Sequence, residues 1–142
     1  MKIVKWFAIV TLAAITVYVA STAYKPETKS TLTNAEAVEL RVMPWLTAML
    51  ESDWEETYNF TSPGYRSGVS LVDHTLKMAA RRVTWIGAEI LSSECDDEVC
   101  RVNIRIIYKV FSPLRGLREF ESFETIHTNW IKVDNDWWLV PS

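Results

Sequence analysis

The sequence predicts an α+β domain in which helices come first and an antiparallel sheet follows. Apolar residues recur every three or four positions between residues 34 and 80, as in amphipathic helices. They then recur at every second position from residue 83 to 140, as in half-exposed strands. Helices followed by a run of strands are typical of α+β proteins. With 142 residues, 49% of them hydrophobic and 23% charged, the chain has the size and composition of one domain with one core.

The first helix is expected over residues 34–50. Thr33 and Glu36 have the spacing of a capping box, and apolar residues follow at helical intervals. Pro44 lies inside this segment and removes one backbone hydrogen bond, so we expect a kink or a break there.

Two further helices are expected before the sheet. Asp53 can cap a short helix that runs to Phe60, and the Thr-Ser-Pro-Gly run at 61–64 predicts a turn. Ser70 can cap another helix that ends near residue 80. Its expected apolar stripe consists of Leu71, Val72, Thr75, Leu76 and Ala79.

The alternation of apolar and polar residues predicts strands over 83–94, 100–110, 120–133 and 136–140. The apolar phase slips between Phe120 and Phe123, which predicts a β-bulge near Ser122. Asp134 and Asn135 predict a tight hairpin turn between the last two strands. The strands therefore form a meander.

Cys95 and Cys100 flank four residues at the tip of the first predicted hairpin. In an oxidising compartment such a pair is expected to form a disulfide that fixes the register of the two strands. A free or redox-active pair and a metal site are the alternatives, and only His74 and His127 could complete a metal site. We expect the disulfide, no metal and no cofactor.

This register sets Glu89 opposite Ile106, on the apolar side of the sheet. A desolvated carboxylate in that position could act as an acid or a base. A bulge at Gly87 would instead place Glu89 in water. Both placements are open at this stage.

The first 23 residues have the pattern of an export segment. Lys2 and Lys5 precede an uncharged stretch at 6–23, and a polar tether follows at 24–32. The stretch is either cleaved before Tyr24 or kept as a membrane anchor, since it is long enough to span a bilayer. The positive charges place the domain outside the cytoplasm, so we expect it on the periplasmic side of a bacterial inner membrane, or soluble in the periplasm or secreted.

Aromatic residues suggest two kinds of binding surface. Tyr58, Tyr65 and Arg66, near His74, are candidates for a ligand pocket. Two residues on the apolar faces of the predicted strands, Trp85 and Tyr108, are further pocket candidates. The candidates for a partner surface on the sheet are Trp130, Ile131, Trp137 and Trp138.

The charge pattern argues against nucleic acid as a partner. The net charge is −3 and the isoelectric point is near 5.4. A basic row is expected at Arg101, Arg105 and Lys109. The acidic side chains expected across the hairpin from this row are Glu119, Glu121 and Glu124.

Several short motifs resemble the nuclear transport factor 2-like superfamily, in particular its small exported bacterial members. They are Trp45-Leu46, Asp53 with Tyr58, the run at 62–66, Trp85 with Ala88, the cysteine pair, Trp130 and Trp137-Trp138. The resemblance covers residues 34–142 and implies a cone-shaped fold, with helices packed on a curved sheet. It also implies a possible homodimer through the sheet face.

Together these observations predict an exported, non-catalytic binding or assembly domain over residues 33–142, tethered to the membrane if 6–23 is kept. Its ligand would be a protein partner or a small apolar molecule. The alternative is a small pocket enzyme of the isomerase or dehydratase type with Glu89 as the acid–base group.

Overall fold

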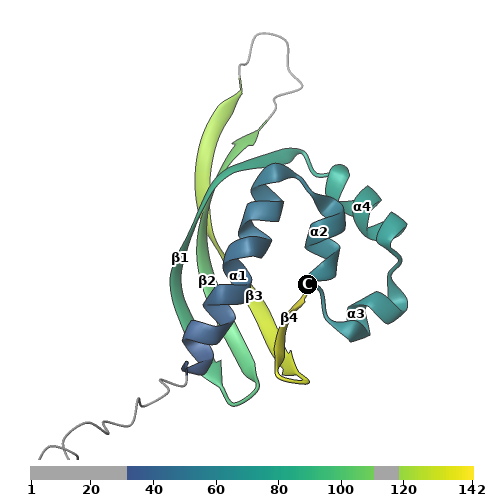
Figure 1. The fold of residues 1–142 in the computed structure, drawn as a ribbon. Coiled ribbons are helices and arrows are strands. Elements are labelled where there is room, and N and C mark those ends of the chain that lie inside the picture. The colour runs from purple at the N-terminus through teal and green to yellow at the C-terminus, as the bar shows by residue number, and fades with distance from the viewer. Residues whose placement is uncertain (1–31, 111–118) are drawn as a thin grey trace, which may run out of the picture. The chain divides into compact units, whose positions relative to one another are not determined.

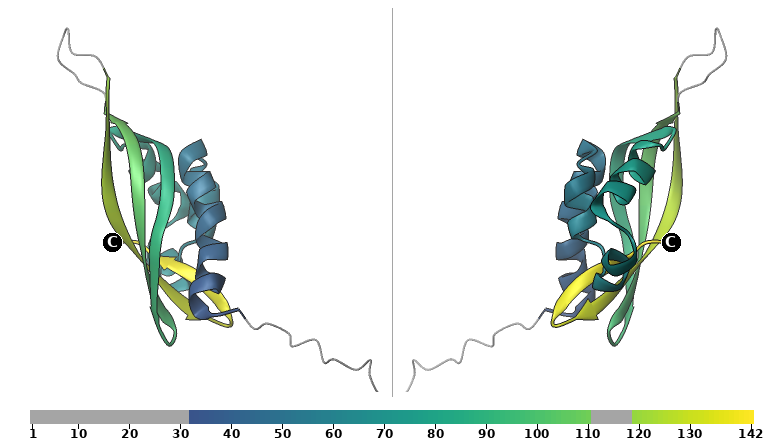
Figure 2. Two further views of the ribbon diagram at one scale, coloured as in Figure 1. Left: turned by 90° about the vertical axis from the view of Figure 1, so that its left-hand side faces the viewer. Right: turned by 90° about the vertical axis from the view of Figure 1, so that its right-hand side faces the viewer.

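The structure, a computed structural model, describes residues 32–110 and 119–142. The elements in chain order are α1 (Asn34–Glu51), α2 (Trp54–Asn59), α3 (Pro63–Gly68), α4 (Leu71–Ala79), β1 (Val83–Asp96), β2 (Val99–Val110), β3 (Phe120–Val133) and β4 (Asp136–Val140). The strands form one antiparallel sheet in the order β1-β2-β3-β4. The predicted α+β class is therefore confirmed. Figures 1 and 2 show a curved sheet with the helices gathered on one of its faces.

The start of α1 is fixed by a complete capping box. The Glu36 backbone N–H donates to Thr33 Oγ1 at 3.2 Å, and the Thr33 backbone N–H donates to Glu36 Oε2 at 2.8 Å. The helix continues through Pro44 without the expected break. Pro44 is exposed, so water can reach the carbonyl that its ring leaves without a donor.

One face of α1 packs on the inner face of the sheet and forms the core. Val38 and Val42 are fully buried, and the Trp45 ring lies edge-on to the rings of Trp85 and Trp130, with centroids 6.0 and 5.8 Å away. The sheet contributes buried side chains from alternate positions of β2, namely Cys100, Val102, Ile104 and Ile106. Burial of these apolar surfaces is the main stabilising term of the fold.

The helical region differs from the prediction in two places. Residues expected to form only a turn begin α3, in which Pro63 occupies the first turn and Ser62 Oγ accepts from the Tyr65 backbone N–H. In α4, Val72 and Leu76 are 66% and 64% exposed, so the expected apolar stripe is not the buried face. The buried side of α4 carries His74 and Met78 instead, at positions i and i+4.

The register of β1 and β2 contains two irregularities, one of them next to Gly87, where the sequence left a bulge open as an alternative. Cys95 pairs with Cys100, but the register shifts between Trp85 and Gly87 and again between Ile90 and Ser92. Between β2 and β3 the register is continuous, so the bulge expected near Ser122 is absent. The extra residues lie in β1 rather than β3.

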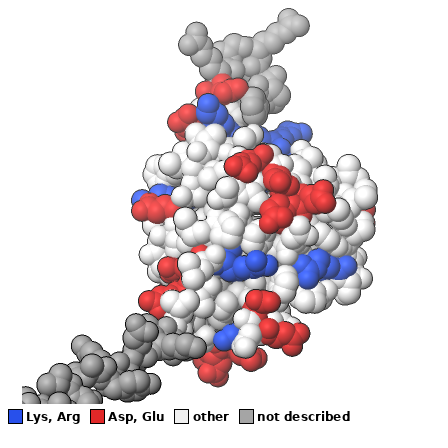
Figure 3. Space-filling model, viewed as in Figure 1, with Lys and Arg blue, Asp and Glu red and all other residues white. Residues whose placement is uncertain are grey.

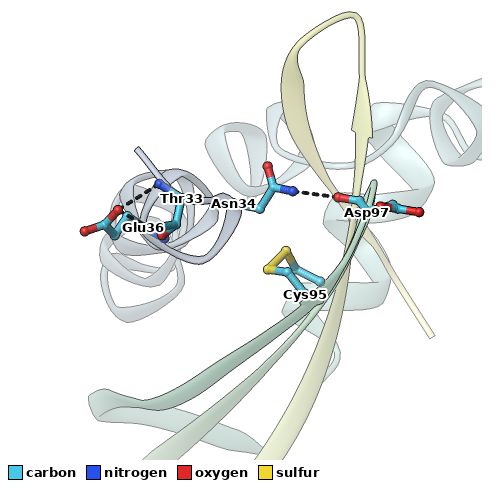
Figure 4. The surroundings of a disulfide bond; sticks show 6 residues. Thr33, Asn34, Glu36, Cys95 and Asp97 are labelled. Atoms are coloured by element: carbon cyan, nitrogen blue, oxygen red, sulfur yellow. Dashed lines mark hydrogen bonds between the residues drawn. A yellow bond between two sulfur atoms is a disulfide. The ribbon is translucent and has the colours of Figure 1, made fainter. Parts of the chain in front are cut away.

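A disulfide joins Cys95 to Cys100 at the closed end of the β1–β2 hairpin (Figure 4). Next to it, Asn34 Nδ2 donates to the Asp97 carbonyl at 2.8 Å and links the start of α1 to the hairpin tip. Closing so short a loop stabilises the fold by about 2 kcal/mol in the chain-entropy model.

The other hairpin end is also well defined. Asp134 and Asn135, the two residues between β3 and β4, both have positive φ angles, of 51° and 67°, as a primed two-residue turn requires. The segment after α2 covers the free edge of β4: the Ser62 backbone N–H donates to the Leu139 carbonyl, and the Leu139 backbone N–H donates to the Phe60 carbonyl. This edge is therefore partly protected from pairing with another chain.

Within residues 32–110 and 119–142, no helix is long and apolar enough to cross a membrane. The expected signal or anchor segment at 6–23 lies outside the described residues, as does most of the expected tether at 24–32.

Candidate functional site

A pocket of about 410 Å³ lies between the helices and the inner face of the sheet. Its apolar walls come from α1, α4 and the strands and include Trp45, Met49, Met78, Trp85, Ile106 and Ile126. Pockets that bind small molecules are of this size and have mostly apolar walls with a few polar groups.

The polar groups of the pocket come mainly from one side of α4 and its C-terminal extension. His74, Lys77 and Met78 have the spacing i, i+3 and i+4, which places them on one face of α4, and Arg81 follows just after the helix ends; all four line the pocket. His74 is only 4% exposed. This face is directed at the pocket because α4 packs on α2 through His74.

A chain of hydrogen bonds connects three helices at this wall. Tyr65 Oη of α3 lies 3.2 Å from His74 Nδ1, and His74 Nε2 lies 3.1 Å from Thr57 Oγ1 of α2. Thr57 Oγ1 in turn donates to the Trp54 carbonyl at 2.9 Å. Both ring nitrogens of the buried imidazole therefore have a partner.

Tyr58 supports this chain from behind. Its ring centroid lies 5.3 Å from that of His74 and 6.5 Å from that of Tyr65. Its hydroxyl donates to the Val69 carbonyl at 2.7 Å, at the end of α3. Tyr58 therefore fixes the positions of the rings and does not line the pocket.

The environment of the pocket shifts the pKa values of three side chains. Burial lowers the pKa of His74, and the positive charges of Arg81 and Lys77 lower it further. Burial and the neighbouring Tyr58 raise the pKa of Tyr65, against an opposing effect of Arg81. Burial also lowers the pKa of Arg81, which still remains a cation. At neutral pH the site thus holds a neutral imidazole and a neutral phenol.

Three charged residues also line the pocket, namely Lys77, Arg81 and Glu124. In the part of the chain that the structure describes, no ion pair shorter than 4.0 Å involves any of them. The same residues, 32–110 and 119–142, contain no group of three His, Cys, Asp or Glu side chains arranged to hold a metal ion. The pocket thus combines apolar walls with hydrogen-bonding groups and with the charged side chains of Lys77, Arg81 and Glu124.

The structure brings some of the predicted pocket residues together and separates others. Tyr65, Trp85 and Tyr108 line the pocket. Arg66 does not, because its guanidinium lies over the Trp138 ring, 4.7 Å from the centroid, and donates to a backbone carbonyl at the end of α2.

Glu89 is not inside the sheet: of the two placements that the sequence left open, the structure has the one in water, so Glu89 does not supply an acid–base group to the pocket. It pairs with Arg105 across the hairpin, with Oε2 3.5 Å from the Arg105 guanidinium, and its side chain is 66% exposed. The predicted register placed Glu89 opposite Ile106. The extra residue between Ile90 and Ser92 shifts the pairing by one, and a shift of one residue moves a side chain to the other face.

Two of the four residues predicted for a partner surface are buried. Trp130 and Trp137 are 0% and 4% exposed and belong to the core. Trp138 is half-buried beneath the guanidinium groups of Arg41 and Arg66, and Ile131 is half-buried. None of the three tryptophans presents a free indole face.

Exposed apolar side chains of the sheet lie both beside Ile131, where its pairing partner Val99 is 51% exposed, and farther along β2 and β3. Ile107 and Phe123 pair across β2 and β3 and are 43% and 73% exposed. The expected basic row beside them is partly neutralised, since Lys109 lies 3.7 Å from Glu121. Figure 3 shows acidic and basic side chains interspersed over the helical side of the molecule.

Three residues of the site were not among the sequence-based candidates, namely Thr57, Lys77 and Arg81, and His74 was named only as a neighbour of the tyrosines. The spacing of His74, Lys77 and Arg81 was a usable signal, because residues so spaced share a helical face. Thr57 gave no such signal, since its role depends on how α2 and α4 meet.

No protein-family model matches the chain, and no curated protein matches it in sequence. The fold is similar to that of a SEC-C motif containing protein from Rhodopseudomonas palustris, with a TM-score of 0.57 and 12% identity over 74% of this chain and 76% of that one. It is also similar to a SEC-C motif containing protein from Psychrobacter arcticus, with a TM-score of 0.52 and 14% identity over 79% of this chain and 63% of that one.

These similarities correct the family expected from the sequence. The solved structures with this arrangement are described as SEC-C motif containing proteins, so the assignment to the nuclear transport factor 2-like superfamily was wrong. At 12% and 14% identity the likeness concerns the fold alone. The function must therefore be argued from the pocket.

Proposed function

We propose that residues 33–142 form a non-catalytic binding domain whose pocket takes a small, mostly apolar ligand. The observation that supports this most directly is the pocket of about 410 Å³ with Trp45, Trp85 and Ile106 among its walls. Its volume corresponds to on the order of a dozen water molecules. Displacing that water with apolar atoms is favourable by about 25 cal/mol per Å² of apolar surface buried.

The polar groups favour binding over catalysis. His74 is engaged at both ring nitrogens, and the carboxylate predicted for acid–base work, Glu89, lies on the outer face. A few polar groups among apolar walls fix the orientation of a ligand and provide specificity.

Filling the pocket with a larger side chain tests this proposal. Ile126 of β3 lines the pocket and is half-buried. We expect Ile126→Trp to weaken the binding of 2-adamantanol, a rigid apolar alcohol of eleven non-hydrogen atoms, at least tenfold, because the indole occupies the space of the ligand. The dissociation constants would be measured by titration calorimetry.

The matched control introduces the same side chain one position earlier. Thr125 is exposed on the opposite face of β3, so Thr125→Trp should bind 2-adamantanol like the unchanged protein. Equal binding by all three proteins would place the ligand outside the pocket, and no binding by the unchanged protein would argue against the proposed function.

We also propose that the domain is exported and held at, or released from, the outer side of a bacterial inner membrane. Lys2 and Lys5 before the uncharged stretch at 6–23 support this, as does the Cys95–Cys100 disulfide. Fractionation of cells that express the full chain, with intact-mass measurement, should find oxidised protein in the membrane or periplasmic fraction. Full-length protein with both thiols reduced in the cytoplasmic fraction would contradict export.

A further inference from the structure

We infer that Tyr65 offers the pocket a hydrogen-bond acceptor rather than a donor, and that the ligand is an apolar alcohol or phenol whose hydroxyl donates to it. This inference rests on the proposed function and names the ligand class. It follows from the order of protons along the chain Trp54–Thr57–His74–Tyr65, which the geometry determines one step at a time.

The first step is the direction of the Thr57 hydroxyl. Thr57 Oγ1 lies 2.9 Å from the Trp54 carbonyl oxygen, which can only accept. If the hydroxyl proton pointed elsewhere, two lone-pair-bearing oxygens would face each other at hydrogen-bond distance. The single proton of Thr57 is therefore donated to Trp54, as is common for threonine within a helix.

The second step assigns the tautomer of His74. Because Thr57 has no further proton to donate, its oxygen must accept from His74 Nε2, 3.1 Å away. Nε2 therefore carries the proton of the neutral imidazole, and Nδ1 is left with a lone pair. The alternative tautomer would leave Nε2 facing the Thr57 oxygen without a proton between them.

The third step concerns Tyr65. His74 Nδ1 accepts, so the Tyr65 hydroxyl 3.2 Å away donates its only proton to it. What Tyr65 can still offer is a lone pair on its oxygen. Tyr65 and His74 both line the pocket, so this lone pair is available to a bound molecule.

The fourth step is the ligand. An alcohol or phenol can donate to the Tyr65 oxygen, and its own lone pairs can accept from the cations that line the same pocket, Lys77 and Arg81. A ketone of the same shape can accept from those cations but leaves the Tyr65 oxygen without a donor. The alcohol thus makes one hydrogen bond more than the ketone, worth about 0.5–1.5 kcal/mol, so we expect it to bind about tenfold more tightly.

Glu124 of β3 adds a carboxylate to the lining of the pocket. This carboxylate can accept from a ligand hydroxyl but not from a ketone, so it adds to the preference for a donor. Variants of Tyr65 and Thr57 are needed to separate the two effects.

The experiment has two parts, both on the full chain. Nitrogen-15 NMR of the histidine rings should show His74 protonated at Nε2 and not at Nδ1. Titration calorimetry should show that 2-adamantanol binds about tenfold more tightly than 2-adamantanone, and Tyr65→Phe should remove most of this preference.

Thr57→Val is a sharper test than Tyr65→Phe, because it should reverse the preference between the two probes rather than only remove it. Without the Thr57 oxygen, Nε2 has no acceptor, so the tautomer protonated at Nδ1 becomes favourable and donates to Tyr65. Tyr65 then donates its proton into the pocket, and the preference should shift toward 2-adamantanone. Thr47→Val on α1 is the matched control, because Thr47 also donates to a helix carbonyl but does not contact His74.

The outcomes separate the two proposals. A His74 ring protonated at Nδ1 in the unchanged protein would overturn the inferred order of protons, whatever binds. The expected tautomer with equal binding of both probes would overturn the ligand class. The expected tautomer with no binding of either probe would overturn the proposed function, and the ligand class with it.

Discussion

Replacing Trp130 with alanine is expected to lower the free energy of unfolding by about 3–5 kcal/mol. Trp130 is 0% exposed, and its ring packs edge-on to Trp45 at 5.8 Å. Its Nε1 donates to Thr128 Oγ1 at 3.0 Å. The alanine variant therefore loses apolar burial and an aromatic contact and leaves a cavity. Equilibrium unfolding in urea measures the change.

Phe123→Ala on the same strand is the control. Phe123 is 73% exposed on the outer face, so its removal should change the free energy of unfolding by no more than about 0.5 kcal/mol. The two substitutions remove aromatic side chains only seven positions apart. A loss of stability for Phe123→Ala as large as that for Trp130→Ala would contradict the assignment of Trp130 to the core and Phe123 to the surface.

The sequence predicted the architecture well where one face of an element is uniformly buried. The apolar positions of α1, such as Val38, Val42 and Trp45, are buried as their spacing indicates. In β2 the strict alternation from Cys100 to Ile106 also matches the buried face. The period of apolar residues is sufficient in such elements, because only one of their faces is covered by the rest of the fold.

The register of β1 was not predictable in the same way. Residues around Ile86 and Leu91 are apolar and fit either face, so nothing in the sequence marks the extra residues. A bulge was suspected at Gly87, and one register shift does lie directly before it; Gly87 itself pairs with Ile107, whose side chain would lie 3.3 Å from an added Cβ. Glycine is used there for close approach across the strands. The face of Glu89 depends on the other irregularity, the extra residue between Ile90 and Ser92.

The candidate site was only partly predictable. Tyr65 lay in a recognisable turn sequence, but its partner His74 is buried while the apolar Val72 and Leu76 of the same helix are exposed. Hydrophobicity alone selects the wrong face of α4. Hydrophobicity alone also fails for Trp138, which was expected on a partner surface but is covered by Arg41 and Arg66 from two different helices. Contacts between distant elements determined both outcomes.

Replacing His74 with alanine is expected to cost about 2–4 kcal/mol in the free energy of unfolding. The imidazole joins α4 to α2 through Thr57 and to α3 through Tyr65, and it packs against the Tyr58 ring. Its removal leaves a cavity between three short helices, which are unstable alone. Urea unfolding at neutral pH measures the loss.

The same variant should change how stability depends on pH. The pKa of His74 is lowered in the folded state from its ordinary value of 6.5, mainly by burial, with Arg81 and Lys77 adding to the effect. Below pH 6.5 the unfolded chain therefore takes up a proton at His74 that the folded chain does not yet bind, and this favours unfolding. The contribution of His74 to stability is complete above that pH and is lost as the pH falls below it. Tyr58 and Tyr65 also face the imidazole, and Glu124 lines the same pocket; all three are common to both proteins.

The chain has two histidines, which makes the comparison clean. His127 is exposed on the outer face of the sheet, where its Nδ1 contacts Asn103 Oδ1 at 2.6 Å. His127→Ala should keep the fall in stability below pH 6.5, and His74→Ala should lose most of it. If both variants retained the same dependence on pH, the buried imidazole could not be the group that titrates, and its position between Thr57 and Tyr65 would have to be revised.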